Sequence, residues 1–209
     1  MCGRFSLWSD KNKILQHYGL EAGTDIITSY NIPPSFHIPA LRLNNGKELV
    51  NLHWGFIPHW AKDTKMQPVN ARSDGVATKP MFRDAFRQRR CLVPVNGYFE
   101  WYSFERRKQP YFIKVKDAEI FSFAGIWTKW DSPDKSIESC ALITTEAPPQ
   151  LLHIHDRMPV ILEPTQYDEW LEKGGVEMLK PYYGEMVAFA VSTSVNTPKN
   201  QGPSLIQPI

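Results

Sequence analysis

Strand-like segments dominate the second half of the sequence and decide the fold class. Continuous or alternating apolar runs between turn residues are typical of β-strands. Such runs occupy residues 92–102, 111–116, 120–130, 139–145, 158–162 and 186–194. Helical patterns do not alternate regularly with these runs, which argues against a doubly wound α/β sheet. We therefore predict an α+β fold with a mostly antiparallel, strongly curved sheet or β-barrel-like core and a few covering helices.

Three helices and one hairpin are predicted beside these strands. They occupy residues 9–19, 40–54, 80–90 and 163–175. Ser9 is a typical N-cap for the first helix, which ends near Gly19. Asn45-Gly46 is the turn signal of the hairpin. Pro164 at the start and Gly174-Gly175 at the end bound the last helix.

The composition is that of a folded globular chain. Of the 209 residues, 42% are hydrophobic and 22% are charged, and the net charge is +2, which excludes disorder as the main description. This length fits a single domain over residues 1–209. The sequence has no apolar run of membrane-spanning length and no signal-peptide core near its start. We therefore expect a monomeric cytoplasmic protein with no membrane partner.

Cys2 differs from the other two cysteines. Cys91 and Cys140 lie in apolar strand-like runs, where buried and inert thiols are expected. Removal of Met1 would place Cys2 at the amino end, where an α-amine with a usual pKa of about 7.7–8.0 accompanies a thiol with a usual pKa of about 8.5. Such a pair attacks an acyl carbon or captures an aldehyde as a five-membered thiazolidine. An ordinary start codon followed by a structural cysteine explains the same residues.

Glu100 is a carboxylate within an otherwise aromatic strand. Burial among rings would raise its pKa and suit it to proton transfer near neutral pH. Alternation along the strand places Glu100 on one face with Tyr98 and Tyr102, and Phe99 and Trp101 on the other. A solvent-facing or arginine-paired carboxylate is the structural alternative.

A histidine-rich segment follows residue 152. In an extended conformation His153, His155 and Arg157 would share one face, which suits proton transfer or phosphate binding. A metal site is the weaker interpretation, because no HExxH motif or paired CxxC motif supplies further ligands. No metal or cofactor is predicted, and either histidine has a purely structural explanation as well.

A basic surface with an aromatic ring is predicted around the second helix. Arg83, Arg87 and Arg90 fall together on one side of residues 80–90. Trp60 is the ring that we expect to be most exposed. Phosphate neutralisation combined with ring stacking would suit single-stranded nucleic acid of any sequence.

Four motifs follow one another along the chain. They are Met1-Cys2-Gly3-Arg4-Phe5, Asn70-Ala71-Arg72, Gly97-Tyr98-Phe99-Glu100-Trp101 and His155-Asp156-Arg157-Met158-Pro159. Together they resemble the SOS-response-associated peptidase (SRAP) family over essentially the whole chain. A departure is His59-Trp60-Ala61, where a bacterial member has two adjacent tryptophans. The resemblance implies one domain, with a β-barrel-like α+β core and a basic channel for single-stranded DNA.

The resemblance also implies an activity. Family members process abasic sites and link their N-terminal cysteine covalently to abasic DNA. By position, Cys2 would be the nucleophile, Glu100 the acid/base, and Asn70 and His155 polar partners of the opened sugar. Arg4, Arg72 and Arg157 would hold phosphates. The predicted DNA contacts are completed by Trp60, Arg83, Arg87 and Trp101. The implied partner is single-stranded DNA with abasic sites, and lyase activity and self-removal of Met1 are implied as side reactions.

Two other functions remain open at this point. N-terminal-nucleophile glutamine amidotransferases also begin with Cys-Gly and use the terminal amine as a base, although the other three motifs do not fit them. A passive single-strand binder would use the same basic helix without any chemistry at Cys2.

Overall fold

The computed structural model describes residues 2–105 and 107–209. Five strands close into a barrel, because each pairs with the next and the last pairs with the first. In spatial order these are β3 (His37–Leu43), β4 (Lys47–Trp54), β10 (Ser136–Glu146), β9 (Phe121–Asp131) and β6 (Arg90–Val95). Only the pairing of β10 with β4 is parallel within this ring. The predicted α+β fold with a barrel-like, mostly antiparallel core is confirmed.

Three short strands extend the barrel sheet. These are β5 (Asn70–Arg72), β11 (Arg157–Pro159) and β12 (Ile161–Leu162). Both β5 and β11 pair with β10, β5 in parallel and β11 antiparallel. Two of the four sequence motifs are thereby brought to the same strand from positions some 85 residues apart along the chain.

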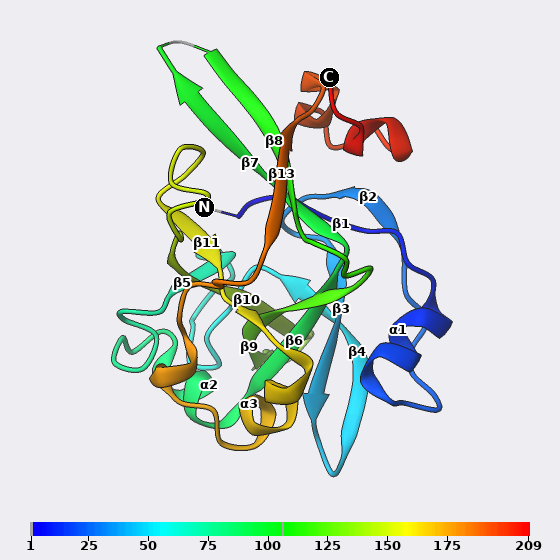
Figure 1. Ribbon diagram of the computed structural model, residues 1–209. Helices are drawn as coiled ribbons and strands as arrows, with labels where there is room; N and C mark the ends of the chain where they lie inside the picture. The colour runs from blue at the N-terminus through cyan, green and yellow to red at the C-terminus, as the bar shows by residue number, and fades with distance from the viewer. Residues whose placement is uncertain (1, 106) are drawn as a thin grey trace.

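A second, antiparallel sheet carries the other two motifs. Its strand order is β13 (Met186–Ala190), β8 (Arg107–Val115), β7 (Gly97–Phe104), β1 (Phe5–Leu7) and β2 (Ser29–Ile32). Figure 1 shows the β7–β8 hairpin extending away from the barrel, with the C-terminal segment beside it. Two 3₁₀ helices lie in that segment, η3 (Thr193–Asn196) and η4 (Pro203–Ile206).

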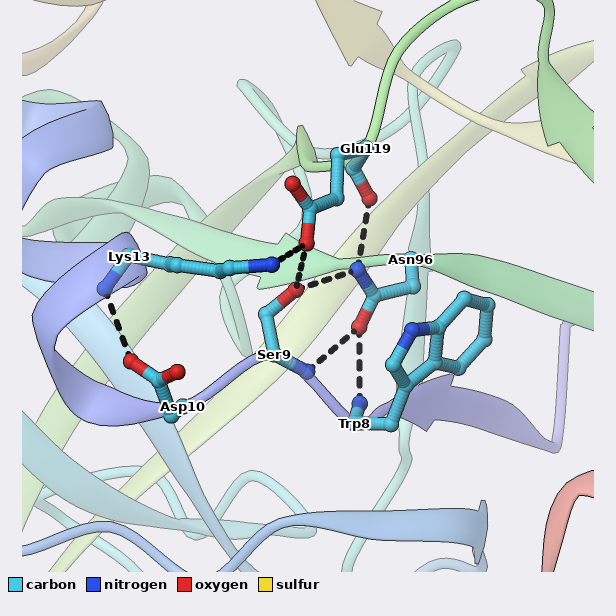
Figure 2. A network of polar contacts seen from close by, with 6 residues as sticks. All are labelled: Trp8, Ser9, Asp10, Lys13, Asn96 and Glu119. Carbon is cyan, nitrogen blue, oxygen red and sulfur yellow. Dashed lines mark hydrogen bonds and ion pairs between the residues drawn. The ribbon is translucent and has the colours of Figure 1, made fainter.

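The chain changes sheet at Asn96, between β6 and β7. We predicted one strand over residues 92–102, but the structure divides it in two. The side chain of Asn96 accepts hydrogen bonds from the backbone N–H groups of Trp8 (2.7 Å) and Ser9 (3.0 Å), and its Nδ2 donates to Ser9 Oγ (2.7 Å) and to the Glu119 carbonyl (2.5 Å) (Figure 2). This fully satisfied buried amide fixes the end of β1 against the turn between the two sheets.

A small second core covers one face of the second sheet. It contains Phe99, Phe112, Val191, Val195 and Leu205, with Trp101 packed against it. The predicted alternation along β7 is therefore confirmed, since Phe99 and Trp101 share this face while Tyr98 belongs to the main core. Gly97 is required there, because a Cβ at this position would lie 2.1 Å from Phe112 Cζ.

The helices pack around the barrel, and their ends differ from the predicted ones. They are α1 (Lys11–Tyr18), α2 (Arg83–Gln88) and α3 (Tyr167–Lys173), and the 3₁₀ helices η1 (Pro164–Gln166) and η2 (Val176–Met178) flank α3. The predicted N-cap at Ser9 is wrong: Asp10 caps α1, because Ser9 is engaged by Asn96. Gly19 ends α1 at φ 65°, as predicted.

The predicted hairpin at Asn45-Gly46 is confirmed, with paired residues from His37–His53 to Leu43–Lys47. The strands predicted at 158–162 and 186–194 differ: the first is split at Val160 and the second ends at Ala190. No helix among the described residues combines the length and apolar character needed to cross a membrane.

Candidate active site

Cys2 lies where the two sheets meet. Its side chain is fully buried, and Asn70 Nδ2, from β5 of the barrel sheet, donates a 2.7 Å hydrogen bond to its carbonyl. The Arg4 carbonyl accepts from both the Cys2 thiol (3.8 Å) and the Phe99 N–H (2.9 Å) of β7. The main chain around Cys2 is therefore held by both sheets at once.

The Cys2 thiol is neutral in this environment. Burial raises its pKa well above the usual range, and the negative charge of Glu100 raises it further. A neutral thiol is a poor nucleophile. Reaction at this sulfur therefore requires a proton acceptor close by.

Glu100 has the properties of that acceptor. It lies on β7 and is 3% exposed. Burial raises its pKa from 4.5 to about 7, and the negative charge of Asp156 acts in the same direction. Both protonation states are thus populated near neutral pH, as general acid–base catalysis requires. The prediction that a carboxyl among these rings is desolvated is confirmed.

Asn70 offers a second polar group to the site. While Nδ2 holds Cys2, the buried Oδ1 has no hydrogen-bond partner among the described residues. A buried acceptor without a partner is uncommon in folded proteins and calls for an explanation. A hydroxyl group of a bound substrate would satisfy it.

His155 lies beside Asp156 in the segment before β11. Its Nδ1 is 3.0 Å from the Arg157 N–H and 2.8 Å from Asp156 Oδ1. The first contact requires an unprotonated Nδ1 and the second a protonated one. Burial lowers the pKa of His155, which favours the neutral ring, with Nδ1 accepting from the Arg157 N–H and Nε2 carrying the proton.

The predicted extended face of His153, His155 and Arg157 is wrong. Residues 151–154 form a turn, closed by a hydrogen bond from the His155 N–H to the Leu151 carbonyl. His153 is turned toward β8, where its ring packs edge-on against Tyr111 at 6.3 Å between centroids. Asp156, the residue after His155, acts electrostatically on Glu100 and raises the pKa of that carboxyl.

The three arginines expected to hold phosphates differ in their surroundings. Arg4 Nη1 donates to Asn31 Oδ1 (2.7 Å) and to the Val195 carbonyl (2.9 Å), so this side chain ties the amino end to the C-terminal segment. Arg157 is 9% exposed and its Nη2 donates to Thr144. Arg72 is exposed and pairs with Asp74 at 2.6 Å. Of these three, Arg72 presents its charge most openly to solvent.

Three of the side chains predicted to contact DNA from this surface are exposed. Trp60 is 53% exposed, and Arg83 and Arg87 are exposed on α2. Arg90 does not belong with them: α2 ends at Gln88, and the buried Arg90 guanidinium donates to carbonyls of α2 and α3, including that of Trp170 at 2.7 Å. Trp101 is half-buried and donates to Asn196 Oδ1 at 2.7 Å.

Two further residues shape the site without having been singled out from the sequence. Asn31 is fully buried and donates to the carbonyls of Val195, Thr197 and Asn200, which fixes the segment that holds Arg4. No local pattern around Asn31 indicates this long-range role. Tyr98 shares the Glu100 face of β7, as alternation predicted, and its buried hydroxyl has no hydrogen-bond partner among the described residues.

Cys91 and Cys140 are fully buried, and burial raises the pKa of each thiol. This confirms their predicted burial and leaves Cys2 as the cysteine with adjacent acid–base groups.

Among the described residues, no group of three or more histidine, cysteine or acidic side chains is arranged to hold a metal ion. A cavity of about 410 Å³ beside β3, β4 and β10, lined by His37, His53 and Glu138, includes no predicted site residue.

The chain is similar in sequence to proteins of two bacteria along nearly its full length. It is 37% identical over 223 residues to the abasic site processing protein YoqW of Bacillus subtilis, covering 99% of each chain. It is 30% identical over 230 residues to the abasic site processing protein YedK of Escherichia coli, covering 100% of each chain.

The fold has a close structural relative as well. A crystal structure of a protein from Bacteroides thetaiotaomicron superimposes with a TM-score of 0.90 at 28% identity, covering 100% of both chains. Residues 1–198 match the family described as SOS response associated peptidase (SRAP). Together with the four sequence motifs, this match shows that the chain belongs to the SRAP family.

Proposed function

We propose that this protein processes abasic sites in single-stranded DNA by forming a covalent crosslink through Cys2. The observation that carries the proposal is the pairing of a rigidly held Cys2 with Glu100, a buried carboxyl whose pKa is about 7. The relatives YoqW and YedK are named as abasic site processing proteins, which supports the same substrate. The setting would be the response to DNA damage, in the cytoplasm or at the nucleoid.

The reaction begins with removal of Met1 and opening of the sugar ring. Removal of Met1, by the protein itself or by an aminopeptidase, exposes the α-amine of Cys2. An abasic deoxyribose opens to an aldehyde when O4′ takes a proton and the C1′ hydroxyl loses one. Protonated Glu100 supplies the first of these protons, since its pKa near 7 keeps a large fraction of the acid form available.

Capture then proceeds in two bond-forming steps. The Cys2 amine adds to C1′, and loss of one water gives a Schiff base. The Cys2 thiol passes its proton to the Glu100 carboxylate while sulfur bonds to C1′ and the C=N electron pair returns to nitrogen. Glu100 then passes that proton to the nitrogen. The product is a thiazolidine ring. Asn70 Oδ1 and the Nε2–H of His155 would bind the sugar hydroxyls during these steps.

The Schiff base is also a branch point. If it loses the 3′ phosphate by β-elimination before sulfur attacks, the strand is cleaved and the protein behaves as a lyase. Because the Cys2 thiol belongs to the same residue as the amine, ring closure is intramolecular and strongly favoured. We therefore propose crosslinking as the main outcome and strand cleavage as a minor one.

Single-stranded DNA would contact the exposed side chains of Trp60, Arg72, Arg83 and Arg87. Exposed cations neutralise phosphates and an exposed ring stacks on bases without regard to sequence. Specificity for abasic sites then comes from the aldehyde. Arg4 and Arg157, which are engaged by protein groups, would act mainly by holding their own segments in place.

The test uses protein lacking Met1 and a single-stranded oligonucleotide with one abasic site, resolved on a denaturing gel. The wild-type protein should give a heat-stable shifted band, and Cys2→Ala none. Cys140→Ala is the matched control, because Cys140 is equally buried but its pKa is raised by burial and by Cys91 rather than by a carboxylate. A Cys2→Ala protein that binds the DNA normally, alongside a wild type without a shifted band, would indicate a passive binder instead.

A further inference from the structure

Two histidines face each other across the β3–β4 hairpin and have no part in the proposed reaction. His37 begins β3 and is paired in register with His53 of β4. The next pair, Ile38 and Leu52, is fully buried in the barrel, so alternation turns both imidazoles to the outer surface of this sheet. Directly opposed residues of antiparallel strands have Cβ atoms about 4.5–5.5 Å apart, which brings their side chains into contact.

The separation of the two rings suits one shared metal ion. The ring centroids of His37 and His53 are 5.7 Å apart, and the ring planes make an angle of 66°. An imidazole nitrogen binds a transition metal at about 2.0–2.1 Å, which places the ring centroid about 3.2 Å from the metal. Two rings that share an ion at a nitrogen–metal–nitrogen angle of about 90–120° therefore have centroids about 4.5–5.5 Å apart. A small side-chain rotation brings both rings onto one ion.

The contacts of His53 prepare its ring for coordination. His53 Nε2 lies 2.8 Å from Gln67 Oε1, and Gln67 Nε2 donates to the Thr64 carbonyl at 2.6 Å. Because the Gln67 amide points its nitrogen at Thr64, its oxygen accepts from the His53 Nε2–H, and Nδ1 of the neutral ring carries the lone pair. Histidine ligands usually donate their other ring N–H to an oxygen in this way, which fixes the tautomer and the orientation of the ring.

Both imidazoles line the cavity of about 410 Å³, which has room for further ligands of an ion. Lys135 and Glu138 line it as well and contribute opposite charges. Glu138 Oε1 accepts from Arg42 Nη1 at 2.9 Å, so this carboxylate balances cations and is not counted as a metal ligand. Water would take the remaining positions on the ion, as it does at metal sites that protein groups do not fill.

We propose that His37 and His53 together bind one divalent first-row transition metal ion at this cavity. Imidazole suits Cu²⁺, Ni²⁺ and Zn²⁺, and Cu²⁺ binds most tightly in the usual order of affinities. Because one hairpin holds both ligands, the second bond forms intramolecularly, and such linkage raises affinity by about 10²–10⁴. No third histidine, cysteine or acidic side chain of the described chain joins them, so the ion is exchangeable. The site is independent of the proposed function.

The experiment titrates Cu²⁺ into the full chain with Cys2→Ala, because the thiol of Cys2 would bind metal by itself. Calorimetry gives the Kd, and pulsed electron paramagnetic resonance counts the imidazoles bound to the ion. We expect one ion per chain with two imidazoles. Adding His37→Gln to this parent should leave one imidazole and weaken binding about 100-fold or more, since the linkage between the two ligands is lost.

His59→Gln in the same parent is the matched control, because His59 is exposed and does not line the cavity. It should change neither the Kd nor the number of bound imidazoles. His37 is exposed too, so its replacement should keep the Tm of the metal-free protein, and His53→Gln gives a second, independent comparison. A single bound imidazole in the parent would overturn the proposal, and so would a Kd that is unchanged by His37→Gln and by His53→Gln.

Discussion

Glu100→Gln should stabilise the protein at alkaline pH while abolishing most of its activity. The folded state raises the pKa of Glu100 from 4.5 to about 7 because burial disfavours the carboxylate. The folded state therefore binds a proton that the unfolded state releases between these two values. The stability that this proton provides is fully present below pH 4.5 and is lost as the pH rises through about 7. Glutamine mimics the protonated form at every pH.

The magnitude follows from the difference between the two pKa values. At about 1.36 kcal/mol for each pH unit, a rise from 4.5 to about 7 corresponds to about 3 kcal/mol of unfolding free energy. For a protein of 209 residues this shifts the thermal midpoint by about 6–12 °C. We expect Glu100→Gln to gain this much over the wild type at pH 8 and almost nothing below pH 4.5.

The assay is thermal or urea unfolding of both proteins at pH 4.5, 6 and 8, with the crosslinking rate measured on the same samples at pH 6 and 8. Groups such as His17 titrate equally in both proteins, so the difference between the two curves isolates Glu100. Parallel pH–stability curves would show instead that Glu100 ionises in the folded protein as it does in the unfolded chain.

Three further predictions rest on single contacts. Gly97→Ala should prevent normal packing of the second sheet, because the new Cβ would lie 2.1 Å from Phe112 Cζ; a near-wild-type Tm by calorimetry would contradict this. Asn96→Ala should cost about 2–4 kcal/mol of unfolding free energy in urea titrations, because it leaves the Trp8 and Ser9 N–H groups without their acceptor; a loss below about 0.5 kcal/mol would count against the anchoring role of Asn96. Arg87→Ala should weaken noncovalent binding of undamaged single-stranded DNA and reduce the slope of log K against log salt by about 0.7, the value expected for one single-strand phosphate contact. Because Arg90 is buried, Arg90→Lys is an unsuitable control, and Arg107→Ala on the β7–β8 hairpin is used instead. Equal slopes for Arg87→Ala and the wild type would remove Arg87 from the interface.

Local sequence patterns predicted those features that depend on local energetics. The hairpin at Asn45-Gly46 forms as predicted because this dipeptide suits the tight turn whatever lies beyond it. The two faces of β7 also follow from alternation alone. The buried environment of Glu100 was predictable for the same reason, since its strand neighbours are aromatic.

Features that depend on distant partners were predicted wrongly. Ser9 and Asp10 are equally good N-caps, and the choice falls to Asp10 because Asn96, 87 residues along the chain from Ser9, engages Ser9. Arg90 has helical spacing with Arg83 and Arg87, but carbonyls of α3 draw it into the interior as β6 begins. The extended histidine segment failed because hydrogen bonds to Leu151 close a turn.

The site itself required the fold. Asn70 and Glu100 lie on different sheets, and only the meeting of those sheets at Cys2 brings both to one residue. The unpaired hydroxyl of Tyr98 is likewise invisible in the sequence, because a tyrosine in a strand gives no sign of whether its hydroxyl has a partner. The family resemblance supplied the candidate residues, and the structure supplied their protonation states and contacts.

In the proposed reaction, the Cys2 amine and thiol both bond to C1′ of the opened sugar. Intact mass spectrometry of the wild-type protein after incubation with abasic single-stranded DNA tests this directly, followed by proteolysis to locate the modified residue. We expect one adduct whose mass is that of the protein without Met1 plus the DNA, less one water. It should lie on Cys2 and be stable without borohydride reduction. An adduct on another residue, or one that survives only after reduction of a Schiff base, would contradict it.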